Sequence, residues 1–147
     1  MRVDKIEILE DNKDEIRKIE EVCNKLVGKA NYNNDKASHF KDQKHCDAII
    51  YGNIDDGKII VLLEVTSRHI EREDYKDKMD NVRSYIKSMG EHKGSKIICT
   101  IHSNQGFGKD IAIYNLKYHV YPIRCNENKS LCEIIREVYP ETRKGTD

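Results

Sequence analysis

Residues 47–67 constrain the fold more than any other part of the chain. Two apolar runs of strand length, residues 48–51 and 59–63, flank the turn sequence Asp55-Asp56-Gly57. β-Branched and aromatic residues favour strands, and Asp and Gly tolerate the positive φ angles of tight hairpin turns. The segment therefore predicts an antiparallel β-hairpin.

One acidic residue stands at each far end of this hairpin, Asp47 on the first strand and Glu64 on the second. With residues 55–56 as a two-residue loop, the two acids face each other with Cβ atoms about 5 Å apart. With residues 56–57 as the loop, Asp47 faces Thr66 and lies diagonal to Glu64, at about 7–8 Å. Both registers put the carboxylates on one face, where they repel each other without a counter-ion. Because a hard cation such as Mg²⁺ takes oxygen ligands, the pair predicts a metal site.

The rest of the chain alternates helical and strand patterns, which predicts a single domain over residues 1–141 and a frayed tail at 142–147. Apolar residues recur at helical spacing in residues 14–28, 68–89, 109–116 and 130–139, and further strands are expected at 96–102 and 118–123. Residues 1–9 fit either an opening strand or the first turns of a helix, and a short strand is expected at 37–40. This order predicts an α/β fold with a mixed sheet and helices on both sides.

Composition excludes several classes of protein. The 147 residues contain 26 Lys plus Arg and 26 Asp plus Glu, so no overall charge attracts nucleic acid, although a local basic patch remains open. The five cysteines have no C-x-x-C spacing, which argues against a zinc ribbon or a full disulfide framework. We see no signal peptide and no apolar segment of membrane length, so we expect a soluble, intracellular, cytoplasmic protein.

An acid at the head of one strand, a hairpin, and then Glu64-Val65-Thr66 followed by a helix resemble the pattern of the PD-(D/E)XK nuclease superfamily. The resemblance covers residues 44–124 and is closest to archaeal and viral resolvase-like members and small nuclease-like domains. It implies a restriction-endonuclease-like fold with Asp47 as the first acid and Glu64 as the second. It also implies Mg²⁺ or Mn²⁺ held by these two acids and the Val65 carbonyl.

The third position of the motif departs from the family pattern, because Thr66 stands where the family has lysine. That lysine helps to position the attacking water and offsets phosphate charge, whereas threonine supplies no charge. Some members take the basic group from a neighbouring element. Lys78 is the first candidate here, because it lies one turn from Tyr75 and Val82 on the inward side of the predicted helix. If no residue replaces the lysine, catalysis has been lost.

Three functions remain open. The first is a metal-dependent endonuclease that hydrolyses DNA, or RNA, with Asp47, Glu64, Thr66 and Lys78 in its site. The phosphate contacts in this hypothesis come from basic residues that flank the acids in sequence: Lys41, Lys44, Arg68, Arg72 and Lys76. The second is a catalytically inactive module that binds single-stranded nucleic acid, with Tyr32, Phe40 or Phe107 as stacking platforms. The third is a structural or dimerising protein with solvated acids. A homodimer is compatible with each, and no membrane partner is expected.

Overall fold

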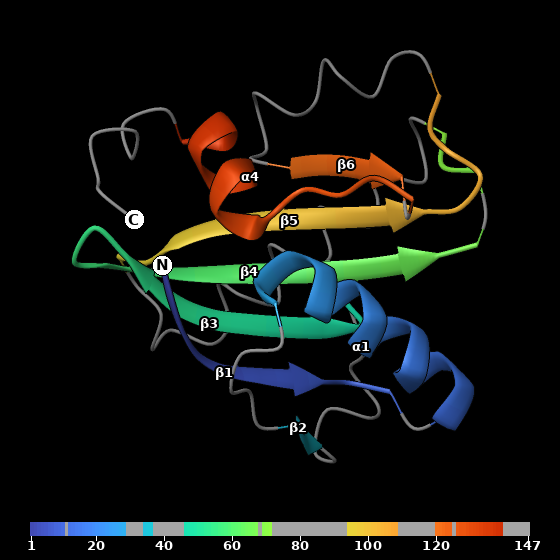
Figure 1. Ribbon diagram of the computed structural model, residues 1–147, viewed down its shortest axis with the longest axis horizontal. Helices are drawn as coiled ribbons and strands as arrows, with labels where there is room; N and C mark the ends of the chain where they lie inside the picture. Colours follow the sequence, from blue (N-terminus) through green and yellow to red (C-terminus); the bar gives the residue numbers. More distant parts are fainter. Residues whose placement is uncertain are drawn as a thin grey trace.

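A computed structural model describes residues 1–10, 12–28, 34–36, 46–67, 69–71, 94–108, 120–124 and 126–139. These residues form a six-stranded sheet in the order β2-β1-β3-β4-β5-β6 (Figure 1). The strands are β1 Arg2–Ile8, β2 Asn34–Lys36, β3 Ala48–Ile54, β4 Gly57–Thr66, β5 Lys96–Ser103 and β6 Val120–Arg124, and the helices are α1 Lys13–Val27 and α4 Leu131–Val138.

The sheet is mixed, as the sequence predicts. β3 runs antiparallel to both β1 and β4, whereas β5 runs parallel to β4 and to β6. The opening residues form strand β1 and not the start of α1. Strand β2 pairs in parallel with β1, on the side of β1 away from β3. Pro122 lies on β6, the edge strand of the described sheet next to β5, and edge strands tolerate proline.

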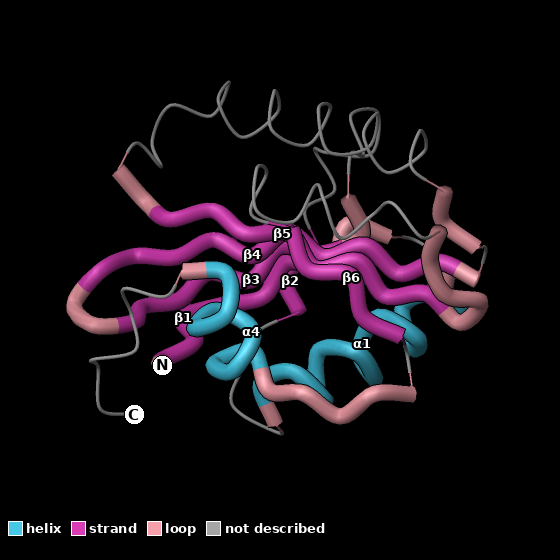
Figure 2. The backbone as a smooth tube through the Cα atoms, turned by 90° about the horizontal axis from the view of Figure 1, so that it is seen from above, coloured by secondary structure: helices cyan, strands magenta, loops and turns pink. Residues whose placement is uncertain are grey.

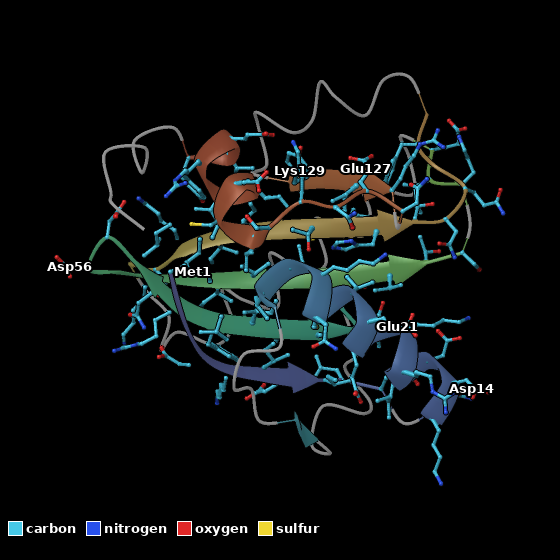
Figure 3. The ribbon with its side chains drawn as sticks, in the orientation of Figure 1. Met1, Asp14, Glu21, Asp56, Glu127 and Lys129 are labelled. Carbon is cyan, nitrogen blue, oxygen red and sulfur yellow. The ribbon has the colours of Figure 1, made fainter. Side chains whose placement is uncertain are left out.

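The β3–β4 hairpin adopts the first of the two predicted registers. Asp55 and Asp56 form the two-residue loop with φ angles of 49° and 62°, and Gly57 already pairs with Ile54. The pairing continues to Ala48 opposite Leu63. Two consecutive positive φ angles match the twist of antiparallel strands, which explains the choice of loop. Asp56 marks the hairpin end of the sheet in Figure 3.

The two described helices, α1 and α4, lie on the same face of the sheet (Figure 2). Asn12 accepts the N–H groups of Asp14 and Glu15 at the start of α1, and Ser130 accepts the N–H of Glu133 at the start of α4. The helices bury a core shared with alternate residues of the strands. Its members include Ile19 of α1 and Ile134 of α4 together with the strand residues Ile6, Ile50, Val61, Ile98 and Ile123.

The opposite face of the sheet is buried as well. Ile49, Ile60, Leu62 and Ile101 alternate with the residues that face the helices, and each is at most 2% exposed. The helix predicted at 68–89 does not include its first described residues, 69–71, because Ile70 forms a bridge with Phe107 there. The rest of that helix and the helix predicted at 109–116 lie outside the described residues, so helices on both sides remain a prediction. The strand predicted at 37–40 and the tail also lie outside them. No helix of the described ranges is long and apolar enough to cross a membrane.

Candidate functional site at the carboxyl end of β4

Asp47 closes the end of the β3–β4 ladder with both its backbone and its side chain. Its N–H donates to the Leu63 carbonyl at 2.9 Å, and its own carbonyl accepts the Leu9 N–H at 2.8 Å. Its carboxylate oxygen Oδ2 accepts the N–H of Val65 at 2.8 Å. The paired register ends at Ala48, so the carboxylate takes the place of a backbone acceptor for Val65. This bond fixes the orientation of the Asp47 carboxylate.

Glu64 lies one residue before Val65 and is the only charged residue among the buried ones that the structure describes, with 8% of its surface exposed. It pairs in register with Ile101 of β5, so its side chain leaves the sheet on the face opposite α1 and α4. Burial of a carboxylate is costly unless its charge is compensated. For Glu64, this burial contradicts the hypothesis of an acid merely solvated at a strand end. Asp47 is half-buried.

The buried thiol of Cys46 indicates that the two acids lie in one neighbourhood. Burial raises the pKa of this thiol, and the negative charges of Glu64 and then Asp47 raise it further. A smaller contribution to the same shift comes from Glu7 of β1. The thiol therefore stays protonated at neutral pH. Glu64 and Asp47 both act on this one side chain, and a cation would relieve the repulsion between two such carboxylates.

The ligands available to a cation at this point are few. Within the described ranges, no three His, Cys, Asp or Glu side chains gather in an arrangement that could hold a metal. A cation here would therefore rest on Asp47 and Glu64 together with backbone oxygen, for which the sequence predicts the Val65 carbonyl. Two carboxylates with backbone and water oxygens suit Mg²⁺, which keeps several of its waters when bound.

Thr66 is half-buried at the end of β4, and its carbonyl accepts the Asn104 N–H at 3.3 Å. The segments that follow β4 and β5 continue side by side. The Ile70 N–H donates to the Gly106 carbonyl at 3.1 Å, and Ile70 forms a parallel bridge with Phe107. These bonds make an ordered rim beyond the carboxyl ends of both strands, which is where open α/β sheets bind ligands.

Ser103 organises the part of this rim that follows β5. Its hydroxyl oxygen accepts the N–H groups of Gln105 at 3.2 Å and of Gly106 at 3.1 Å. Gly106 has a φ of +91°, and a Cβ built on it would lie 2.8 Å from Nη2 of Arg124. The Arg124 guanidinium therefore rests against the glycine backbone. The sequence analysis missed this residue, because the predicted last strand ends at residue 123, whereas β6 includes Arg124.

The structure brings Asp47, Glu64, Val65 and Thr66 together around the end of β4. The other predicted site residues lie outside the described residues, namely Lys78 and the basic set Lys41, Lys44, Arg68, Arg72 and Lys76. Of the predicted stacking residues, Phe107 is half-buried at the rim, and Tyr32 and Phe40 lie outside the described residues. Their roles remain predictions.

Comparison of the chain with protein-family models, with curated proteins and with solved structures finds no match.

Proposed function

We propose that this protein is a metal-dependent nuclease that hydrolyses phosphodiester bonds, with its site at the carboxyl end of β4. The observation that carries the proposal is the pair of acids. Glu64 is buried, the carboxylate of the neighbouring Asp47 is held by the Val65 N–H at 2.8 Å, and both charges act on the Cys46 thiol. A cation-binding site gives these neighbouring acids a chemical role, because carboxylate oxygens are ligands that Mg²⁺ prefers.

Asp47, Glu64 and Thr66 have different roles in the proposed site. Asp47 is oriented before any ligand arrives, which lowers the entropy lost on binding. Glu64 lies where water is scarce, so its charge acts more strongly on a bound cation than it would in bulk solvent. When bound, Mg²⁺ or Mn²⁺ polarises the phosphodiester and lowers the pKa of a coordinated water. The Thr66 hydroxyl can hydrogen-bond this water but cannot supply the positive charge of the family lysine.

A second candidate function is a nucleic-acid-binding module without catalysis. The neutral Thr66 at the lysine position favours it. The two candidates share a partner, DNA or RNA, and differ in whether the bond is cut. Both predict binding that weakens with salt, because each neutralised phosphate releases counter-ions.

The decisive experiment measures cleavage and binding of labelled single-stranded, duplex and junction DNA, and of RNA, by the wild-type protein and Glu64→Gln. We expect cleavage with Mg²⁺ or Mn²⁺ and none with Ca²⁺. Glu64→Gln keeps the shape of the side chain and removes an anionic ligand, so it should abolish cleavage and Mn²⁺ binding while it preserves substrate binding. Glu21→Gln, at an exposed position of α1, is the matched control and should behave as wild type.

Thr66→Lys separates the two candidates. If the position is vacant, the added charge should raise cleavage, because fixed positive charge near the phosphate stabilises the transition state. If another basic group already occupies the space, the added lysine should crowd that group and lower the cleavage rate. If neither wild type nor Thr66→Lys cuts any of these substrates with Mn²⁺, the nuclease proposal is wrong. Binding without cutting then identifies the inactive module.

A further inference from the structure

The register of the parallel strands places an arginine in the same row as the missing lysine. Thr66 of β4 pairs with Ser103 of β5, and Ser103 pairs with Arg124 of β6. Paired residues of parallel strands point to the same face, and neighbouring strands lie about 4.8 Å apart. The Cα atoms of Arg124 and Thr66 are therefore separated by about 10 Å across the sheet. Arg124 shares the face of Glu64, which lies two residues before Thr66 on β4.

The side chain of Arg124 turns from its edge strand toward the rim and not away from the sheet. A Cβ on Gly106 would lie 2.8 Å from Nη2 and 3.0 Å from Cζ of Arg124, so the guanidinium packs on the bare backbone of the loop after β5. The φ of +91° at Gly106 is a conformation that side-chain-bearing residues rarely adopt. Because Ser103 accepts the N–H of Gly106, the surface under the guanidinium is fixed.

The charge of Arg124 is not neutralised by an acid of the described residues. The ion pairs found among them join other partners, such as Lys129 with Glu137 and Lys5 with Glu7. The nearest carboxylate along the chain, Glu127, accepts the backbone N–H of Arg124 at 3.3 Å and not its guanidinium. Glu127 lies at the end of β6, far from the hairpin tip at Asp56 (Figure 3). An exposed guanidinium with no acid partner in the described part of the chain can bind the oxygens of a phosphate in a bidentate manner.

We propose that Arg124 is a phosphate-binding residue of this site and supplies, from β6, the positive charge that Thr66 cannot supply. This inference rests on the proposed function. It adds which residue binds the phosphate that is cut. The phosphodiester lies between the carboxylates at the end of β4 and the guanidinium at the end of β6. The span of about 10 Å between the two strands accommodates one phosphate group and the reach of an arginine side chain. Arginine, and not the lysine of the family pattern, suits this longer reach.

The test measures the dissociation constant of a fluorescein-labelled oligonucleotide, single-stranded and duplex, as a function of salt. It uses Ca²⁺ so that no substrate is cut. Arg124→Gln should weaken binding about tenfold at low salt and reduce the slope of log Kd against log salt by about one phosphate contact. Arg17→Gln removes an exposed arginine of α1, on the helix-covered face of the sheet. It should leave the dissociation constant and the salt slope unchanged. Arg124→Lys keeps the charge and should preserve the slope while affinity falls by a smaller factor.

Gly106→Ala is a second variant that leaves the charge in place and displaces the guanidinium. It should also weaken binding, and its melting curve shows whether the strained loop still folds. If wild type binds but Arg124→Gln and Arg17→Gln have equal dissociation constants and slopes, the role of Arg124 is refuted and the proposed function stands. If wild type binds no oligonucleotide at low salt, the proposed function itself is refuted, together with the role of Arg124.

Discussion

His102 makes the stability of this protein depend on pH. It lies near the end of β5 on the face that α1 and α4 cover and is 4% exposed, and its Nε2 has no hydrogen-bond partner among the residues that the structure describes. Burial, and then the positive charge of Lys25 on α1, lower the pKa of His102 from its usual value of 6.5 to about 3. The imidazole of the folded protein is therefore neutral at any pH well above 3.

The size of the effect follows from proton linkage. Between pH 6.5 and pH 3 the unfolded chain binds a proton at this histidine and the folded protein does not, so the free energy of unfolding falls as the pH falls. The loss is about 1.4 kcal/mol for each pH unit. At pH 5 it amounts to about 2 kcal/mol relative to pH 8, a substantial part of the 5–15 kcal/mol of an ordinary domain. Above pH 6.5 the contribution is constant, and below pH 3 it stops growing.

The assay is urea denaturation at pH 8, 7, 6 and 5, followed by circular dichroism, on wild type and His102→Leu. Leucine cannot titrate and suits the apolar neighbours of this position in the register, Val65 and Ile123. The variant should lose about 2 kcal/mol less than wild type between pH 8 and pH 5. His69→Gln, at an exposed histidine outside the core, is the control variant and should keep the wild-type slope. Equal pH dependence in wild type and His102→Leu would refute the reasoning.

Two further predictions concern the backbone around the site and the sheet. Asp47→Ala should lower the free energy of unfolding by about 1–3 kcal/mol, because the Val65 N–H loses its acceptor, whereas Asp47→Asn keeps an acceptor oxygen and should cost less. Denaturant titration checks both, and an unchanged stability of Asp47→Ala would show that this bond contributes nothing. Gly52→Ala should cost about 1–3 kcal/mol, since its Cβ would lie 2.7 Å from the Arg2 carbonyl oxygen and 2.8 Å from Cε of Met1. Gly57→Ala, whose nearest contact would be 3.5 Å away, is the control, and equal melting temperatures of the two variants would contradict this account.

Local sequence patterns were sufficient for the elements that form from neighbouring residues. The apolar runs on both sides of Asp55 and Asp56 predicted the hairpin, and the helical spacing of apolar residues in 130–139 predicted α4. Local patterns did not decide between the two hairpin registers, because the register depends on whether both aspartates adopt positive φ angles. That choice is a difference in backbone energy between two loops of similar composition.

The sequence by itself determined that Asp47 and Glu64 stand at the ends of one hairpin and that Thr66 follows two residues after Glu64. Only the tertiary structure decided that Glu64 is buried and that the Asp47 carboxylate bonds Val65. It also decided that Arg124 stands in the row of Thr66. The physical reason is the range of the interactions. Hairpin pairing joins residues close in sequence, whereas the alignment of parallel strands depends on long connections and on the packing of both faces, which no local pattern specifies.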